Sequence, residues 1–184
     1  MKHQTHTTTE LNRYPDIFEY VSKFKDIYDI LSFGCSSGEE YHTLHKYFPN
    51  SNIYGVDINK EILETAKNNN LNKSIFFFDS TESIPNVDII FAMSVFCRWS
   101  ETDGLEYNHI YSFKDFNEEL IKLDDKLNSK GIFVLYNCNY HFLDSDISDK
   151  YTPINIVLRD EFVRKFDKTG KYSQNKSPII FIKK

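Results

Sequence analysis

The amino-acid sequence predicts an α/β fold in which helices cover both faces of a mostly parallel sheet. Short apolar runs alternate with segments whose apolar residues recur every three or four positions, the pattern of strands joined by helices. The run from Val87 to Phe96 is almost continuously apolar, as expected for a strand covered on both faces. The 184 residues fit one domain spanning 1–184, with residues 1–12 expected to be a mobile N-terminal segment.

Residues 30 to 59 form the unit around which the rest of the chain is arranged. An apolar run ending at Phe33 leads into Gly34 and Gly38, a helical segment follows, and a second apolar run ends in Asp57. This order of strand, glycine turn, helix, strand and acid is that of a Rossmann-like unit, which binds nucleosides. Asp57, at the carboxyl end of the second strand, is placed to accept hydrogen bonds from two ribose hydroxyls.

The glycine turn has the spacing G-x-x-x-G, with Ser36 where a dinucleotide-binding loop has its middle glycine. No Gly-Lys-Ser/Thr follows, which argues against a phosphate-binding P-loop. Ser36 and Glu39 have the spacing of a capping box, so we expect Ser36 to cap the following helix. Glu39 therefore has a structural role available, and either Glu39 or Glu40 is a candidate for ligand contact as well.

Local signals place the remaining elements along the chain. Proline in the first turn and Asn or Ser side chains just before an apolar periodic segment are helix-start signals. The predicted elements are a helix from Pro15 to Phe24, a helix capped by Asn59 that runs to Asn68, strands at 74–78 and 87–96, a helix capped by Ser112 with Asp115, and a strand at 132–136. Asp88, near the start of its strand, is expected to be structural.

The sequence of the turn, GCSSGEE, resembles the first motif of the class I S-adenosylmethionine-dependent methyltransferases, and within them the chemotaxis-receptor glutamate methyltransferase branch. The class-level resemblance covers about residues 30 to 140. That branch carries a helical domain and an inserted subdomain for which this chain has no room, so its substrate is not carried over. The resemblance implies a Rossmann-like three-layer α/β/α sandwich with a seven-stranded, mostly parallel sheet and an antiparallel last strand. It also implies a closing hairpin of 162–167 with 178–183.

The resemblance further implies S-adenosylmethionine as cofactor and S-adenosylhomocysteine as product. Arg13 would hold the carboxylate of the methionine moiety, and Asp79 would accept a hydrogen bond from the adenine amino group. The alternatives are a surface arginine and an aspartate that caps a turn. The full set of cofactor-binding candidates is Arg13, Gly34, Cys35, Ser36, Gly38, Glu39, Asp57, Ile58, Asp79, Ser80, Ala92, Met93 and Ser94.

The segment from Cys97 to Tyr111 is long for a strand-to-helix connection and rich in aromatic and titratable side chains. We interpret it as a wall of the acceptor site; the alternative is a surface loop whose Trp99 and Tyr111 pack back on the core. A hydroxyl or ammonium acceptor needs a base, whereas a carboxylate or phosphate acceptor needs cationic positioning instead. The catalytic candidates are Trp99, His109, Tyr111 and His141, and the acceptor-binding candidates are Arg98, Tyr136, Asn137 and Arg159. Each histidine can equally be structural.

Composition and charge indicate which classes of partner the protein is expected to bind. The net charge is −5, although residues 161–184 hold seven Lys and Arg against two acids. We interpret this basic segment as a solvated sheet edge rather than a binding surface, and nucleic acid is not an expected partner. The three cysteines form no CxxC pair, so we expect reduced, buried thiols and no metal site. No apolar run approaches the ~20 residues of a membrane span, and no signal peptide is visible, so a cytoplasmic location is expected.

The sequence therefore predicts a methyltransferase that uses S-adenosylmethionine to methylate an oxygen or nitrogen of a small-molecule acceptor. Two alternatives remain open: a nucleoside-binding module without turnover, and an aminopropyl transferase of the same fold. Neither the acceptor nor the oligomeric state follows from the sequence, because acceptor contacts lie on variable loops.

Overall fold

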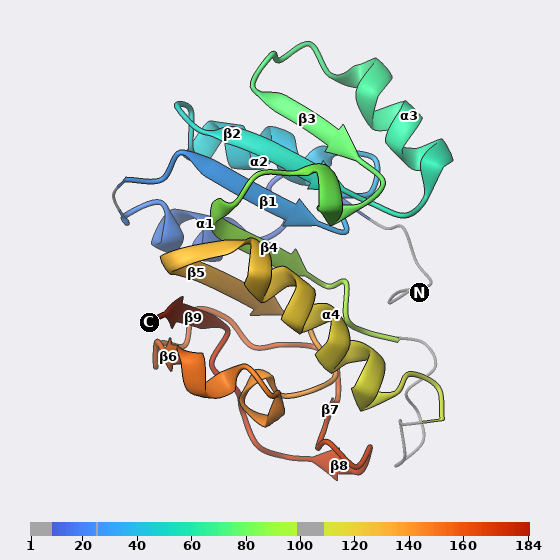
Figure 1. Cartoon of the computed structure of the whole chain (residues 1–184), viewed down its shortest axis with the longest axis vertical. Coiled ribbons are helices and arrows are strands. Elements are labelled where there is room, and N and C mark those ends of the chain that lie inside the picture. Colours follow the sequence, from blue (N-terminus) through green and yellow to red (C-terminus); the bar gives the residue numbers. More distant parts are fainter. Residues whose placement is uncertain (1–8, 25, 99–108) are drawn as a thin grey trace.

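The computed structural model describes residues 9–24, 26–98 and 109–184. Its centre is a seven-stranded sheet of order β3-β2-β1-β4-β5-β9-β6 (Figure 1). The strands are β1 (Asp29–Phe33), β2 (Asn52–Val56), β3 (Ile75–Phe78), β4 (Val87–Met93), β5 (Leu127–Tyr136), β6 (Tyr151–Pro153) and β9 (Ile180–Lys183). The first five pair in parallel, and β9 runs antiparallel between β5 and β6. The predicted fold class, including the antiparallel last strand, is confirmed.

Helices lie on both faces of the sheet. They are α1 (Pro15–Val21), α2 (Glu39–Tyr47), α3 (Lys60–Asn69) and α4 (Phe113–Lys126). Figure 1 shows α4 in front of β4 and β5, with α1 and α2 behind the sheet. Phe18 of α1 and Leu44 of α2 are buried in one core cluster, and Phe116 and Leu120 of α4 are buried in the other. The sheet therefore separates two apolar cores, and burial of both is the main force that holds the layers together.

The helix starts agree with the sequence signals at Pro15, Asn59 and Ser112 and differ at Ser36. The Asn59 side chain accepts a hydrogen bond from Ile62 N at 3.4 Å, and Ser112 accepts one from Asp115 N at 3.1 Å. The capping box expected at Ser36 is wrong, because α2 begins after Gly38, which has φ 108° and makes no side-chain cap. Glu39 instead accepts a hydrogen bond from the Ser37 hydroxyl at 2.8 Å.

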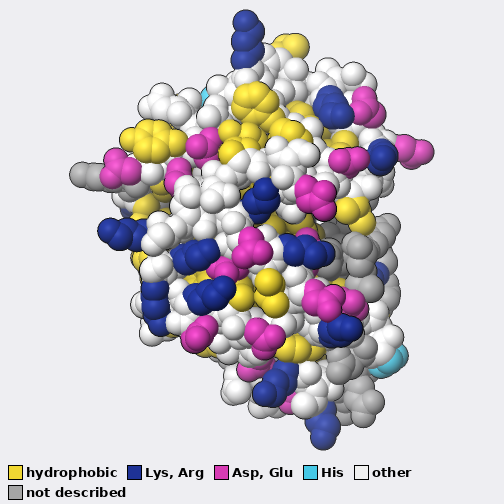
Figure 2. Space-filling view, in the orientation of Figure 1, with side chains coloured by type: hydrophobic (Ala, Val, Ile, Leu, Met, Phe, Trp, Pro, Cys, Tyr) yellow, Lys and Arg dark blue, Asp and Glu magenta, His cyan; other side chains and the backbone are white. Residues whose placement is uncertain are grey.

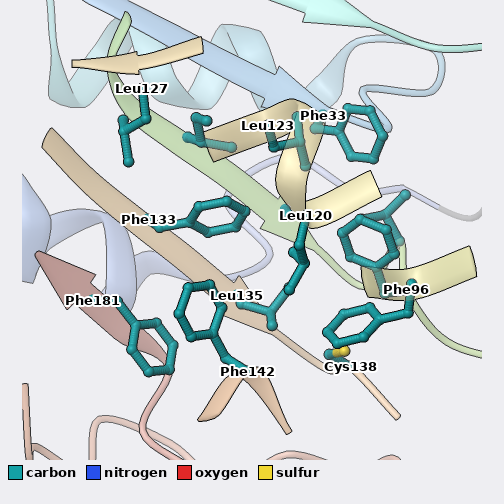
Figure 3. Packing of buried hydrophobic residues seen from close by; sticks show 14 of the residues in the cluster. Phe33, Phe96, Leu120, Leu123, Leu127, Phe133, Leu135, Cys138, Phe142 and Phe181 are labelled. Atoms are coloured by element: carbon teal, nitrogen blue, oxygen red, sulfur yellow. The ribbon is translucent and has the colours of Figure 1, made fainter. Parts of the chain in front are cut away.

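The C-terminal third departs from the predicted hairpin. Its second strand lies where expected, but the edge partner of β9 is β6 rather than residues 162–167. A separate two-stranded sheet instead pairs β7 (Lys165–Phe166) with β8 (Tyr172–Ser173). Short 3-10 turns, η3 (Phe142–Asp144) and η4 (Ser148–Lys150), connect β5 to β6. Phe142 of η3 stacks on Phe181 of β9 with ring centroids 4.0 Å apart, and this contact joins η3 to the core (Figure 3).

No helix of the described residues covers one part of the sheet. In front of β2 and β3, the connection to β4 forms only the 3-10 turn η1 (Thr81–Ser83). The rings of Tyr54 and Phe76 stack there at 5.5 Å, and Phe76 is 39% exposed. Figure 2 shows hydrophobic side chains gathered over this end of the molecule, while charged side chains of both signs cover the part around α4. The apolar surface of this face is thus only partly covered.

Asp88 has the structural role expected of it. Its Oδ2 accepts hydrogen bonds from the backbone N–H groups of Tyr28 and Asp29 at 2.9 and 3.1 Å, and its Oδ1 accepts one from Asn128 at 2.9 Å. These bonds tie the start of β4 to β1 and to β5.

All three cysteines are free thiols buried in the interior, which confirms the expectation of reduced, buried side chains. Among the helices of the described residues, none has the length and apolar character that crossing a bilayer requires.

Candidate active site

The carboxyl ends of β1, β2, β3, β4 and β5 meet at one edge of the sheet, on the right in Figure 1. In parallel α/β sheets ligands bind in the crevice beyond these ends. The loops that follow the strands bring the glycine turn, Asp57, Asp79, Ser94 and Asn137 to this edge.

The glycine turn is fixed by backbone hydrogen bonds and by unusual dihedral angles. Gly34 N and Cys35 N both donate to the Val56 carbonyl, at 2.8 and 3.1 Å, which joins the turn to β2. Gly34 has φ 77°, and Ser36 has φ 51° although it is not glycine. An added Cβ at Gly38 would lie 1.8 Å from the Tyr41 ring. The serine thus keeps the left-handed conformation that a glycine would adopt without strain, and the turn retains its shape.

Asp57 is held at the end of β2 by two backbone donors. Its Oδ2 accepts from Ser36 N and its Oδ1 from Asn59 N, both at 2.9 Å. A carboxylate oxygen has two lone pairs, so each oxygen keeps capacity for one further donor. Ile58, 54% exposed, follows directly and offers an apolar surface beside the carboxylate. The arrangement suits a ligand with two adjacent hydroxyls and a flat apolar ring.

The two candidates after β3 are both engaged within the protein. Asp79 forms an exposed ion pair with Lys60 at 3.4 Å, and the Ser80 hydroxyl accepts a hydrogen bond from Glu82 N at 3.1 Å. Ser80, rather than Asp79, therefore caps this turn. The adenine contact of Asp79 stays a prediction.

Glu40, which the sequence named with Glu39 as a candidate for ligand contact, carries a half-buried carboxyl group beside the glycine turn. Its Oε1 accepts a hydrogen bond from the Ser32 hydroxyl at 2.8 Å. Burial raises the pKa of Glu40 to about 7, against the opposing effects of the Ser32 hydrogen bond and the positive charge of Arg13. The pairing with Ser32 was not predicted, although a small polar residue inside an apolar strand is a signal for a polar partner.

Three polar side chains meet at the end of β4. The Ser94 hydroxyl lies 2.7 Å from Tyr14 Oη and accepts a hydrogen bond from Asn137 Nδ2 at 2.9 Å. Ser94 and Asn137 both have left-handed backbones, with φ 58° and 51°. Ala92 and Met93, by contrast, have buried side chains that belong to the two cores. Tyr14 had no sequence signal of its own beyond its position next to Arg13.

Two arginines lie against Tyr14. The guanidinium carbons of Arg13 and Arg159 are 5.1 and 5.4 Å from the centroid of its ring. Arg159 Nη1 donates to the Arg13 carbonyl at 2.9 Å, and its Nε lies 3.4 Å from Asp16 Oδ2. The Tyr136 hydroxyl donates to the Asp160 carbonyl at 3.0 Å, which fixes the segment that carries Arg159. Positive charge is therefore placed beside the end of β4.

The catalytic candidates occupy very different environments. His109 is exposed, whereas the Tyr111 ring is buried in the core and its carbonyl accepts a hydrogen bond from Tyr140 Oη at 2.6 Å. Tyr111 thus packs back on the core, as the alternative interpretation of this loop expected. The Arg98 guanidinium lies over the Tyr111 ring at 5.8 Å. Trp99 lies outside the described residues.

His141 is buried after β5. Its Nδ1 is hydrogen-bonded to the Ser177 hydroxyl, and burial together with the positive charge of Lys165 lowers the pKa of His141. At neutral pH the ring is therefore uncharged, which is the form that accepts a proton or a hydrogen bond.

Comparison with known proteins identifies the family. Residues 24–176 match the family described as a methyltransferase domain, and the chain belongs to this family. The resemblance to class I S-adenosylmethionine-dependent methyltransferases, and with it the enzyme class and cofactor that the sequence predicted, is thereby confirmed.

Two curated relatives come from Ilyobacter polytropus. Malonyl-[acyl-carrier protein] O-methyltransferase 1 is 28% identical over 169 residues, covering 83% of this chain and 62% of the relative. Malonyl-[acyl-carrier protein] O-methyltransferase 2 is 25% identical over 99 residues, covering 51% of this chain and 38% of the relative. The chain thus spans less than two thirds of the length of these relatives.

Among solved structures, a protein assigned as an O-methyltransferase from Nostoc punctiforme PCC 73102 has a TM-score of 0.50 at 16% identity, covering 67% of this chain and 36% of that one. The plantazolicin methyltransferase BpumL, in complex with a triazolic desmethylPZN analog and SAH, has a TM-score of 0.47 at 22% identity over 66% and 45% of the two chains. At these identities the likeness to the Nostoc protein concerns the fold alone.

Proposed function

We propose that this protein transfers the methyl group of S-adenosylmethionine to an oxygen atom of a small or carrier-bound acceptor. The observation that carries the proposal is the joint placement of the glycine turn and Asp57 beside the Tyr14–Ser94–Asn137 group. A nucleoside held by the first two strand ends would have its reactive end towards β4, where these three polar side chains lie.

The residues at the strand ends fit the donor molecule. The two free acceptor positions on Asp57 suit the ribose hydroxyls, and the exposed Ile58 suits one face of the adenine. Asp79 would accept a hydrogen bond from the adenine amino group. The methionine end carries an ammonium and a carboxylate, and the half-buried Glu40 and the neighbouring Arg13 have the opposite charges. Bound S-adenosylmethionine supplies a methyl group already activated by a sulfonium, so the protein has mainly to bind and align.

Alignment is the chief catalytic contribution expected of these residues. Holding a nucleophilic oxygen in line with the methyl carbon can supply roughly 7 to 11 kcal/mol of the barrier. A carboxylate acceptor needs no base, whereas a hydroxyl acceptor would pass its proton to His109 or His141. We favour oxygen over nitrogen because the curated relatives carry names of O-methyltransferases that act on a malonyl group.

The proposal is tested by the choice of nucleoside. Because Ser36 replaces the middle glycine of a dinucleotide loop, we expect S-adenosylmethionine and S-adenosylhomocysteine to bind in preference to NAD. Isothermal titration calorimetry with the three ligands measures this directly. Binding of NAD with no binding of either methionine nucleoside would overturn the proposal.

The pH dependence of binding tests the role given to Glu40. A cationic ammonium binds to the ionised carboxylate, and with a pKa of about 7 that form is lost as the pH falls below 7. The ammonium of the ligand's amino-acid end is more basic than a peptide N-terminus and stays charged in this range. We therefore expect the affinity for S-adenosylhomocysteine to fall roughly tenfold or more between pH 7 and pH 5.5.

Glu40→Gln is the matched control for this titration. The amide cannot ionise, so the variant should bind more weakly at pH 7 and show a nearly flat profile over the same range. An equally steep profile in Glu40→Gln would assign the titration to another group and remove Glu40 from the ammonium site.

A further inference from the structure

A cavity of about 260 Å³ lies between residues 156–165 and residues 172–179. One wall follows β6 and the other leads into β9, so the cavity is built from the C-terminal third, where the structure differs from the sequence prediction. Phe162, 52% exposed, lines it on one side, and Ser177 lines it on the other. None of the cofactor-binding candidates lines this cavity.

The wall formed by residues 159–162 is fastened to the end of β4 and β5. Phe162 N donates to Asn137 Oδ1 at 3.2 Å, and Asn137 in turn donates to the Ser94 hydroxyl. Arg159 lies over the Tyr14 ring, whose hydroxyl is the other partner of Ser94. The wall of the cavity is therefore linked through Asn137 and Tyr14 to Ser94 at the end of β4, where the methyl group is expected.

The lining of the cavity is positively charged in an acidic protein. It contains four cationic residues, Arg159, Arg164, Lys165 and Lys176, against Asp160 and Glu161, whereas the whole chain has a net charge of −5. Such local excess of one sign raises the local concentration of ligands of the opposite sign.

The cationic side chains differ in how many of their donors already bond to groups of the protein. Lys165 is buried and bonded to Glu161 and to the Cys138 carbonyl, at 2.9 and 2.7 Å, so it serves as a fixed internal pair. Arg159 uses Nη1 for the Arg13 carbonyl and directs Nε to Asp16, and among the described contacts its Nη2 donors remain for a ligand. The Ser177 hydroxyl, oriented by His141, adds a neutral hydrogen-bonding group.

We propose that this cavity receives an oxyanion of the acceptor, a carboxylate or a phosphate, with Arg159 as its principal anchor. This inference rests on the proposed function, because it specifies the chemical class of the molecule that accepts the methyl group. A planar guanidinium forms paired hydrogen bonds with either oxyanion, and the exposed Phe162 offers apolar contact to the carbon chain that joins the anion to the methylated atom.

The test measures anion binding without turnover. The ¹⁵N-labelled protein, with and without saturating S-adenosylhomocysteine, is titrated with malonate, inorganic phosphate and the uncharged malonamide, and amide chemical shifts are followed. We expect malonate or phosphate, but not malonamide, to shift amides of residues 156–165 and 172–179. The anion that binds more tightly distinguishes a carboxylate from a phosphate source.

Variants locate the anchor. Arg159→Gln should weaken binding of the anion about tenfold, and Lys176→Gln should weaken it by a smaller factor. Lys168→Gln removes an exposed charge of the same segment that does not line the cavity, and it should change binding less than twofold. Because Arg159 also contacts Asp16 and Tyr14, the exposed Lys176, which forms an ion pair with Asp160 at 2.7 Å, provides a second variant that does not depend on the packing of Arg159.

Failure of this inference is distinguishable from failure of the proposed function. Absence of anion-dependent shifts in these two segments, or equal binding by wild type, Arg159→Gln and Lys176→Gln, overturns the inference even when calorimetry shows that the nucleoside binds. Anion binding with no nucleoside binding supports an anion site and overturns the methyltransferase proposal instead.

Discussion

Replacing Asp57 with alanine is expected to weaken binding of S-adenosylmethionine by roughly 10- to 150-fold. Hydrogen bonds to a charged group contribute about 1.5 to 3 kcal/mol, and this range corresponds to the predicted loss of affinity. The fold should survive, because Asp57 lies at a strand end and is only half-buried. Calorimetric titration gives the affinity, and circular dichroism of the same samples verifies the fold.

Asp57→Asn separates charge from hydrogen bonding at this position. The amide keeps one acceptor oxygen of nearly the same shape, so its affinity should fall between those of wild type and Asp57→Ala. If Asp57→Ala binds the nucleoside as tightly as wild type, the ribose site lies elsewhere, and the prediction that the ribose binds at the carboxyl end of β2 is wrong.

The second large effect is expected for stability, at Asp124 near the end of α4. This carboxylate is 1% exposed and accepts hydrogen bonds from Lys150 Nζ at 2.6 Å and Tyr151 Oη at 2.8 Å, while Lys183 Nζ lies at 2.9 Å. Removing one partner of a buried ionic group costs about 3 to 5 kcal/mol. We expect Asp124→Ala near the lower limit, because Lys183 keeps the carbonyls of Asp124 and Leu127 as acceptors. Urea unfolding measures the difference.

Asp125→Ala is the matched control, since Asp125 is the exposed neighbour in the same helix and should change the free energy of unfolding by less than about 0.5 kcal/mol. Equal effects of the two substitutions would show that the network adds no specific stability.

The same carboxylate gives stability a defined pH dependence. Burial opposes ionisation of Asp124, but the hydrogen bonds from Lys150, Lys183 and Tyr151 outweigh it and lower the pKa of Asp124 below its ordinary 3.8. The stabilisation is present above 3.8 and is lost as the pH falls through the lowered pKa of the folded state. Acid unfolding of Asp124→Ala should therefore be less steep than that of wild type.

The parts of the fold that the sequence predicted are those set by local signals. The strands around the glycine turn are apolar runs between turn residues, and Asn59 and Ser112 act as caps through bonds that span three residues. The prediction of the closing hairpin failed because that pairing depends on contacts between residues distant in the sequence. β6 is only three residues long, and its place beside β9 depends on contacts of Tyr151 with Asp124, far apart in the sequence.

The candidate site shows the same division. The role of Asp57 could be predicted because the residue directly follows a strand. The pairing of Glu40 with Ser32 and of Tyr14 with Ser94 could not, because it depends on which helix covers which strand. The expected cap at Ser36 failed because the turn is fixed by the Val56 carbonyl and by Asp57, which are distant partners. Residue spacing carries no record of such tertiary hydrogen bonds.

The place of β9 in the sheet has a consequence for the order of folding. Among the described strands, β6 pairs with β9 alone, while β9 joins β5 across fifty positions, from Ile132 to Ile182. Neither β6 nor β9 gains its sheet hydrogen bonds until β9, the last strand, has docked, so the parallel half of the sheet can assemble first and the C-terminal third must follow as one step. Closing such a long loop is entropically costly and slow. During that interval β5 presents an open, apolar edge, which is the stage at which a nascent or refolding chain is most exposed to misassociation.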